Sequence, residues 1–257
     1  MPSSDHPAAQ QPAQHPAPSP SARPGAAPGE PRRYNASYDE QPEVYETLRA
    51  EGHMTRRRVQ YFEEVLRRVP GRVLEVGSGT GTLLRRLAGT HPERRFTGVE
   101  PLPNYVDFAN GRSRDLGLDN VVFEVGTGEV LPAGVADSSV DLIISVDALH
   151  HVEDLDAVIA EASRVAAPGA RWRAMEPNRL HPYVFLWHTV TAGERTFDAG
   201  DFLRRAQAAG WRLVGKDRLY IFPSTVQQVP AWAERLERRL ERVPFLSGGL
   251  ALDLVKD

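Results

Sequence analysis

The stretch VLEVGSGTGT at residues 73–82 decides the fold class of this chain. It contains a short apolar run with one acid, three glycines at alternate positions, and the start of a helical pattern. Glycine lets a backbone turn sharply and approach a ligand, and the N-terminus of the following helix offers free N–H groups to an anion. The stretch therefore predicts a strand–turn–helix unit beneath a nucleotide-like ligand, although ordinary turns also use glycine.

Outward from this stretch, short apolar runs alternate with helical patterns. The strand-like runs are 73–76, 96–100, 121–125, 140–146 and 171–176, and the helical patterns between them are 82–88, 105–116 and 155–166. Such alternation is typical of βαβ units, whose right-handed crossovers place helices on both faces of a parallel sheet. We therefore predict a doubly wound, Rossmann-like α/β fold with a seven-stranded, mostly parallel sheet.

The end of the chain departs from this repeat. Asp198 suits the N-cap of a helix running to Ala209, and residues 211–222 contain strand-like apolar positions. A helix at 232–243 and a last strand at 250–255 are expected after it. The pattern leaves the position of that last strand in the sheet open.

The beginning of the chain predicts a tail followed by a helical lead-in. Residues 1–33 are rich in Pro, Ala, Ser and Gln, which is typical of disorder. Residues 34–70 carry apolar positions at three- and four-residue spacing, as amphipathic helices do. We therefore expect one domain at 34–257, with 34–70 as lead-in and 177–196 as an inserted segment.

Composition disfavours several functional classes. The formal net charge is −3, the chain contains no cysteine, and it has neither a signal-peptide pattern nor an apolar run long enough to span a membrane. Cytoplasmic location is thus the default, and nucleic acid is not expected as a partner. The arginine doublets and triplets, such as residues 56–58, are expected on a solvated face. A homodimer is left open.

A second acid supports a nucleotide-like ligand. Glu100 ends the apolar run FTGVE, about 20 residues beyond the glycines, where doubly wound folds place an acceptor for ribose hydroxyls. These features alone are compatible with an NAD-dependent oxidoreductase. However, Thr82 stands where the dinucleotide pattern has its third glycine, and Glu75 precedes the first glycine by two residues, where it could receive the ammonium group of an amino-acid ligand.

In these residues, and in DLIISVDALHH at 141–151, the chain resembles class I S-adenosylmethionine-dependent methyltransferases. It is most similar to their small-molecule and lipid-modifying branch, related to ubiquinone-biosynthesis methyltransferases, over residues 65–173. The resemblance implies S-adenosyl-L-methionine as cofactor and methyl transfer to an O, N or C nucleophile of a natural-product or lipid-like intermediate. A protein that binds this cofactor without methylating, such as a cyclase or a partner subunit, stays an alternative.

The resemblance also implies which residues bind the cofactor. The glycine stretch would hold the methionine portion, Glu100 the ribose, and Leu102 the adenine face. Thr127 replaces an aspartate expected to accept from the adenine amino group, and its hydroxyl accepts without charge. The implied set is Glu75, Gly77, Ser78, Gly79, Gly81, Glu100, Pro101, Leu102, Thr127, Gly128, Glu129, Val146 and His151.

Methyl transfer is an in-line displacement, so the protein must align the acceptor, exclude water and supply at most one proton acceptor. Candidates for that catalytic role are His150, His151 and Glu176, although adjacent histidines are often structural. The aromatic segment 177–196 is expected either to cap the substrate or to form a short helix packed on the core. Predicted substrate-binding residues are Tyr45, His181, Tyr183 and Trp187. No metal is expected, because no typical ligand set is complete.

Overall fold

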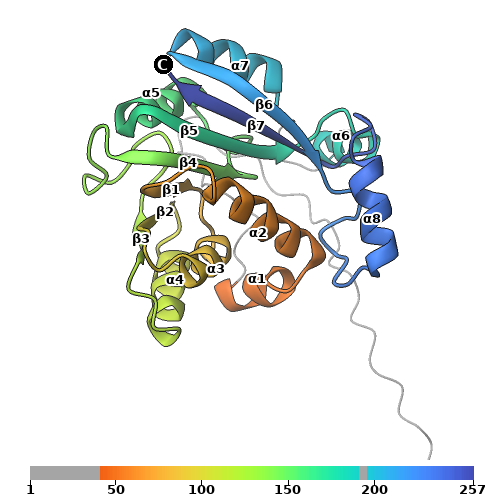
Figure 1. Cartoon of the computed structure of the whole chain (residues 1–257), viewed down its shortest axis with the longest axis horizontal. Coiled ribbons are helices and arrows are strands. Elements are labelled where there is room, and N and C mark those ends of the chain that lie inside the picture. Colours follow the sequence, from red (N-terminus) through yellow and green to blue (C-terminus); the bar gives the residue numbers. More distant parts are fainter. Residues whose placement is uncertain (1–40, 191–195) are drawn as a thin grey trace, which may run out of the picture. The chain divides into compact units, whose positions relative to one another are not determined.

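A seven-stranded sheet carries the candidate site in the computed structural model of the chain (Figure 1). The strand order is β3-β2-β1-β4-β5-β7-β6, and all neighbours pair in parallel except β7, which is antiparallel to β5 and β6. The predicted doubly wound, mostly parallel fold is confirmed. The strands are β1 (Val73–Val76), β2 (Phe96–Glu100), β3 (Val121–Val125), β4 (Val140–Val146), β5 (Ala166–Pro177), β6 (Trp211–Leu219) and β7 (Gly249–Lys256).

The structure describes residues 41–190 and 196–257. The predicted disordered tail, the first residues of the lead-in and part of the inserted segment lie outside this range. The side chains of residues 48 and 187–190 are also outside it, although their backbone is described. The described residues all belong to one compact unit.

Eight helices are found in the described part of the chain. Local chemistry explains several of their ends: Asp198 accepts hydrogen bonds from the backbone N–H groups of Gly200 and Asp201, as predicted for an N-cap, and Gly210 follows that helix with φ 85°. The helices are α1 (Pro42–Arg49), α2 (His53–Leu66), α3 (Thr82–Thr90), α4 (Pro103–Asp115), α5 (Leu155–Val165), α6 (Pro182–Val190), α7 (Ala199–Ala208) and α8 (Ala231–Leu240).

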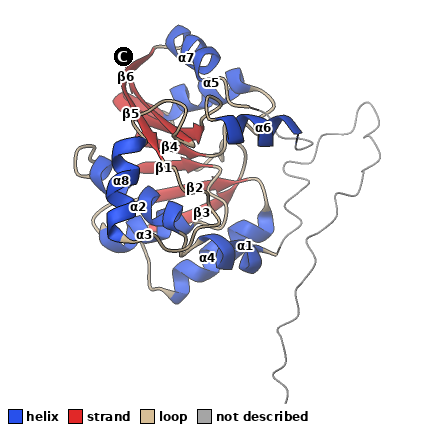
Figure 2. Ribbon diagram, turned by 90° about the vertical axis from the view of Figure 1, so that its right-hand side faces the viewer, coloured by secondary structure: helices blue, strands red, loops and turns tan. Residues whose placement is uncertain are grey.

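Helices cover both faces of the sheet (Figure 2). On one face, Ile159 of α5 and Phe202 of α7 pack with Trp172 of β5. On the other, Phe62 of α2 and Leu84 of α3 belong to a second apolar cluster. Because β1 and β4 at the centre of the sheet are largely buried on both sides, they read as nearly continuous apolar runs in the sequence.

The last strand, whose place the sequence left open, lies inside the sheet. β7 inserts between β5 and β6 rather than at the edge. Its Asp253 pairs with Arg171 and Arg173 of β5, and its leucines belong to the cluster under α5 and α7. These contacts hold the end of the chain in the centre of that half of the sheet.

The strand order reverses between β1 and β4, and doubly wound sheets bind ligands in the crevice outside the strand ends at that point. The turn after β1 and the loop after β4 meet there, because a Cβ added to Gly77 would lie 2.7 Å from the Cβ of Ala148. The fold thus brings together the two most informative stretches of the sequence.

Candidate functional site

The turn after β1 has a backbone that only glycine adopts readily. Gly77, Gly79 and Gly81 have φ values of 74°, 55° and 78°. The backbone N–H groups of Gly77 and Ser78 donate to the carbonyl of Val99 over 2.9 and 3.1 Å, which ties the turn to β2. A Cβ on Gly79 would meet nothing closer than a ring carbon of Tyr45 at 4.0 Å, so the space above the turn is open to a ligand.

Glu75 lies buried beneath this turn with an unused acceptor. Only 3% of the residue is exposed, and its Oε2 has no hydrogen-bond partner among the described residues. Burial raises the pKa of this carboxyl to about 8, with the charge of Arg58 lowering it and that of Glu100 raising it to lesser degrees. A ligand with an ammonium group would supply both the missing donor and the missing positive charge. The residues present therefore fit the amino-acid portion of S-adenosylmethionine.

Glu100 joins the glycine turn to the start of α4. Its Oε2 accepts from the N–H of Gly79 at 2.8 Å, and its Oε1 accepts from the N–H of Leu102 at 3.3 Å. Burial raises the pKa of the carboxyl, and these two hydrogen bonds oppose that shift. Each carboxylate oxygen has a further lone pair, so Glu100 can also accept from ligand hydroxyls. Pro101 beside it is half-buried, as is Leu102.

Helix α1 lies across the glycine turn. Glu46 accepts hydrogen bonds from the hydroxyls of Thr80 and Thr82 and from the guanidinium of Arg85, the first and last at 2.6 and 2.5 Å. Tyr45 packs edge-on against Tyr105 of α4, with ring centroids 5.6 Å apart. Tyr45, expected at the substrate, is thus placed over the turn where a cofactor would lie.

Arg58 of α2 reaches the loop after β4. Its guanidinium donates to Asp147, a residue with φ 50°, and lies 5.7 Å from the ring centroid of Tyr220. The expectation of a solvated arginine face is wrong here: Arg57 and Arg85 are 3% and 5% exposed, and the side chain of Arg58 is 20% exposed. These arginines turn inward and pair with carboxylates of distant elements: Arg57 with Glu237 and Glu241, Arg58 with Asp147, and Arg85 with Glu46.

Glu176 orders the loop that carries the two histidines. Its Oε1 accepts from the N–H groups of Ala148 and Leu149, at 3.1 and 2.9 Å, and its Oε2 lies 2.7 Å from Nδ1 of His150. Glu176 is 1% exposed and His150 6%, whereas His151 is half-buried and lies against His150 with ring centroids 3.9 Å apart. This geometry favours a positioning role for Glu176 over direct contact with a substrate.

The turn after β3 approaches the same edge. The hydroxyl of Thr127 accepts from the N–H of Val130 at 3.2 Å, and Glu129 accepts from the N–H of Glu153 at 3.0 Å. A Cβ on Gly128 would lie 2.9 Å from a methyl carbon of Val76 at the end of β1, so this turn packs directly against that strand. Val146, at the end of β4, is half-buried.

The inserted segment forms α6. Burial lowers the pKa of His181, whose Nδ1 accepts from the N–H of Val184 at 3.4 Å. Tyr183 and Phe185 are 59% and 49% exposed, and the side chain of Trp187 lies outside the described residues. The helix is therefore a surface helix with exposed aromatic rings, and its contact with a substrate stays a prediction.

Three residues of the site were not singled out from the sequence. Asp147 follows β4 directly, just as Glu100 ends β2, so its position at a strand end was an available signal. Glu46 and Arg58 had no such local signal, because their partners are 34 or more residues away. No group of three or more His, Asp or Glu residues in the described ranges could hold a metal ion. Likewise, none of the described helices is long and apolar enough to cross a membrane.

Comparison with known proteins places the chain in one family. Residues 70–208, more than half of the chain, match the methyltransferase domain family. A malonyl-[acyl-carrier protein] O-methyltransferase of Hahella chejuensis is 32% identical over 159 residues, 59% of this chain and 54% of that protein. The 27-O-demethylrifamycin SV methyltransferase of Amycolatopsis mediterranei is 35% identical over 40% of this chain and 38% of its own length. The chain thus spans about half, or less, of these relatives.

Solved structures share the fold. A methyltransferase of Thermotoga maritima, described as S-adenosylmethionine-dependent and a possible histamine N-methyltransferase, superposes with a TM-score of 0.62. The match covers 84% of this chain and 94% of that one at 18% identity, which establishes a common fold.

Proposed function

We propose, from the premise that this chain belongs to the family of S-adenosylmethionine-dependent methyltransferases, that it transfers the cofactor's methyl group to a nucleophile of a small molecule. The observation that carries this proposal is the buried carboxyl of Glu75, which has an unused oxygen beneath an open glycine turn. A dinucleotide brings no ammonium group to that position, so an NAD-dependent reaction leaves Glu75 without a partner.

In this proposal, different residues around the turn bind different parts of the cofactor. Glu75 and the glycine turn, with Ser78, hold the methionine portion. Glu100 accepts from the ribose hydroxyls, while Leu102 and the turn at residues 127–129 border the adenine. Tyr45 covers the site from α1 and excludes water, which a displacement reaction requires.

The proton acceptor, where the reaction needs one, comes from the loop after β4. The cofactor supplies an electrophilic methyl group on a sulfonium, so the protein's own task is to align the nucleophile and accept its proton. Because the Glu176 carboxylate accepts at Nδ1 of His150, it fixes the tautomer that keeps Nε2 basic. We propose His150 or its neighbour His151 as the acceptor and Glu176 as the residue that positions them.

The acceptor molecule is proposed to be a natural-product or lipid-like intermediate. One relative is named an O-methyltransferase of malonyl-[acyl-carrier protein]. Another is named a methyltransferase of 27-O-demethylrifamycin SV. The aromatic rings of α6 are proposed as an apolar wall for such a molecule. Cytoplasmic location and the absence of a nucleic-acid partner stay expectations from the sequence, and the sequence leaves a homodimer open.

Labelled methyl transfer tests this proposal. The protein is incubated with methyl-labelled S-adenosylmethionine and an extract of its host. The products are then compared by mass spectrometry with those of a Glu75→Gln variant. A labelled small molecule that forms with wild-type protein and not with Glu75→Gln supports methyl transfer. Tight cofactor binding with no labelled product from any host fraction would favour the alternative, a cofactor-binding protein that does not methylate.

A further inference from the structure

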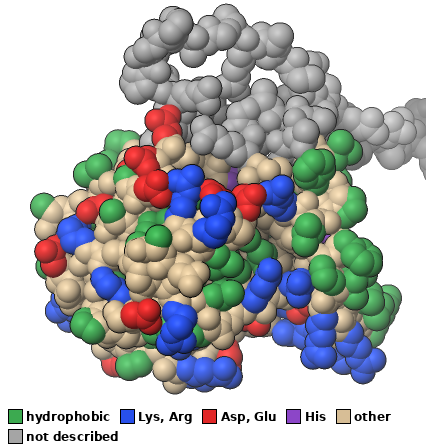
Figure 3. All heavy atoms as spheres, turned by 90° about the horizontal axis from the view of Figure 1, so that it is seen from above, with side chains coloured by type: hydrophobic (Ala, Val, Ile, Leu, Met, Phe, Trp, Pro, Cys, Tyr) green, Lys and Arg blue, Asp and Glu red, His purple; other side chains and the backbone are tan. Residues whose placement is uncertain are grey.

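Helix α8 presents an exposed apolar stripe. Trp232, Leu236 and Leu240 recur at four-residue spacing, which places them along one side of the helix, and they are 65%, 47% and 37% exposed. Phe245, just beyond the helix, is 58% exposed. In Figure 3 hydrophobic side chains lie beside a group of basic side chains at the end of the molecule that carries α8.

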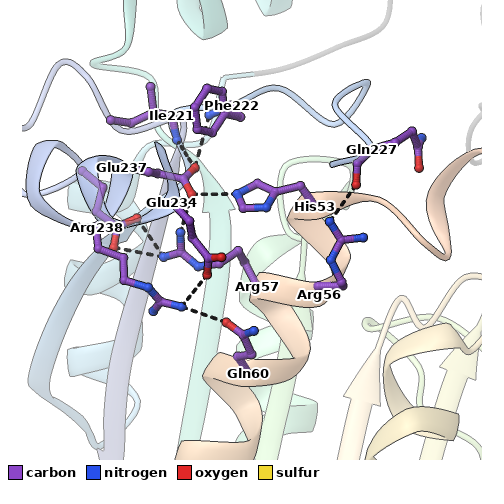
Figure 4. Close-up of polar contacts among 11 residues, drawn as sticks. His53, Arg56, Arg57, Gln60, Ile221, Phe222, Gln227, Glu234, Glu237 and Arg238 are labelled. Carbon is purple, nitrogen blue, oxygen red and sulfur yellow. Dashed lines mark hydrogen bonds and ion pairs between the residues drawn. The ribbon is translucent and has the colours of Figure 1, made fainter. Parts of the chain in front are cut away.

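Charged residues of the same helix and the residues just after it lie partly in the protein interior and partly on its surface. Glu237 is buried and accepts from His53 and Arg57 of α2, at 2.7 and 2.5 Å (Figure 4). Glu241 also accepts from Arg57, at 2.9 Å. Acids and bases nearly balance over residues 231–242, but Glu237 and Glu241 face inward. Three exposed bases, Arg235, Arg239 and Arg242, have no hydrogen-bond or ion-pair partner in the described part of the chain.

A cavity between β6 and α8 continues the basic surface. It has a volume of about 390 Å³ and is lined by Lys216, Asp217, Arg218, Arg238, Glu241 and Arg242. Both of its acids already have partners, since Asp217 accepts from the hydroxyl of Tyr61 and Glu241 from Arg57. Lys216 and Arg218 have none within the described ranges. The lining therefore offers excess positive charge to a phosphate-sized anion.

We propose that this α8 face, defined as Trp232, Leu236, Leu240 and Phe245 with the unpaired basic residues of α8 and β6, docks on the surface of an anionic phospholipid bilayer. Helices that lie in a membrane interface combine Trp, Phe and Leu with arginines in this way, and each basic residue near the surface adds attraction to anionic lipids. The apolar stripe meets the acyl boundary, and Arg235 and Arg239, which flank the stripe on the helix, meet headgroup phosphates.

Other occupants fit the α8 face less well. A second copy in a two-fold dimer would set the same unpaired arginines against each other. A nucleic acid would satisfy the cations but would gain nothing from an aliphatic and aromatic stripe that offers it no hydrogen bonds. A bilayer contacts both the arginines and the apolar stripe favourably, because it has anionic headgroups above an apolar interior.

Docking through α8 has a consequence for the candidate site. α6 and α8 both lie at the end of the molecule where the parallel strands finish (Figures 1 and 2), and α6 exposes Tyr183 and Leu186. An apolar methyl acceptor dissolved in the bilayer would then reach the carboxyl edge of the sheet without crossing water. This consequence, unlike the docking itself, rests on the proposed function.

Vesicle flotation tests the proposal with the full chain and needs neither methyl donor nor acceptor. We expect binding to vesicles of phosphatidylcholine with phosphatidylglycerol, release at high salt, and little binding to phosphatidylcholine alone. The double variant Arg235→Gln/Arg239→Gln should lower the partition coefficient about 25-fold, at about 1 kcal/mol for each arginine. Trp232→Ala should lower it about tenfold.

Matched controls keep the flotation result interpretable. The double variant Arg72→Gln/Arg114→Gln removes two exposed arginines elsewhere, and Leu116→Ala removes an exposed leucine just after α4; both should bind as wild type does. Equal losses in the control and test variants would overturn the proposal, because binding would then reflect overall charge or apolarity. Absence of binding by folded wild-type protein would also overturn it and leave the α8 face to an acidic protein. Neither failure touches the proposed methyl transfer.

Discussion

At the scale of single residues, Glu75 lies in surroundings that disfavour its ionised form. A carboxyl with an ordinary pKa of 4.5 has a pKa of about 8 here because burial removes the water that would stabilise its charge. One of its oxygens also lacks a partner among the described residues. A group that weakens the free protein in this way is typical of binding sites, where a ligand supplies what is missing.

Replacement of Glu75 by glutamine should therefore stabilise the free protein at high pH and weaken cofactor binding. Since its pKa is raised on folding, Glu75 contributes most to stability below pH 4.5, and that contribution is lost as the pH rises toward 8. The Glu75→Gln variant lacks this pH-dependent loss. Its free energy of unfolding should therefore exceed that of wild type by little near pH 5 and by more at pH 8, at about 1.4 kcal/mol per unit of pKa shift.

Urea unfolding at the two pH values measures this difference, and calorimetry with S-adenosylhomocysteine measures the expected loss of affinity. Glu93→Gln, which removes an exposed carboxyl, serves as the control. An equal stability change at pH 5 and pH 8 would show that the burial of charge at Glu75 is not the cause.

Local sequence patterns predicted some site residues and could not predict others. The glycines of the turn and Glu100 sit at strand ends in a recognisable spacing, so their places in the fold followed from the chain alone. Arg58 looked like one of three surface arginines, because its partner Asp147 is 89 residues away. Inward-facing charges are set by such distant pairings, which leave no periodic trace in a single sequence.

At the scale of elements, Glu46 anchors α1 across the glycine turn. Removing its carboxylate takes the acceptor from two threonine hydroxyls and leaves the 5%-exposed guanidinium of Arg85 with the carbonyl of Thr80 alone. We expect Glu46→Ala to raise the trypsin cleavage rate after Arg49 at least tenfold, because one hydrogen bond to a charged group contributes about 1.5–3 kcal/mol and about 1.4 kcal/mol already corresponds to a factor of ten.

Glu43→Ala is the matched control, since Glu43 lies on the exposed side of the same helix and its loss should leave cleavage unchanged. S-adenosylhomocysteine should slow cleavage of the wild type. A Glu46→Ala variant cut no faster than wild type would mean that α1 is held by other contacts and is not a cover.

Helices α2 and α8 are joined by a buried ion-pair network that should be expensive to break. Arg57→Met leaves Glu237 and Glu241 without the guanidinium they share, and loss of one partner from a buried pair costs about 3–5 kcal/mol of unfolding free energy. Arg238→Met breaks an exposed pair with Glu234 and should cost less than about 1 kcal/mol. Urea denaturation compares them, and similar costs for both variants would contradict this account of the network.

The order of elements was predictable from alternation, whereas the position of β7 was not. Strands joined by a helix are normally parallel neighbours, and that rule fits β1 with β2, β2 with β3, and β4 with β5. β7 instead inserts between β5 and β6, held by Asp253 and by leucines whose partners lie far away in the chain. Apolar periodicity shows that a segment is a strand but carries no information about which neighbour it pairs with.

At the scale of the whole molecule, the account depends on the reversal of strand order between β1 and β4. That reversal brings the glycine turn, Glu100 and the loop after β4 to one edge, with α1 placed over them. Each part is common in α/β proteins, but their combination with a buried acid before the first glycine specifies a ligand that has both an adenosine and an amino-acid end.

Calorimetric titration of the full-length protein with S-adenosylhomocysteine, and separately with NAD, tests this central claim most directly. We predict one-to-one binding of S-adenosylhomocysteine, no measurable binding of NAD, and a loss of about 1.5–3 kcal/mol in Glu100→Ala, as expected for hydrogen bonds to a charged group. Folded wild-type protein that binds NAD but not S-adenosylhomocysteine would contradict the account.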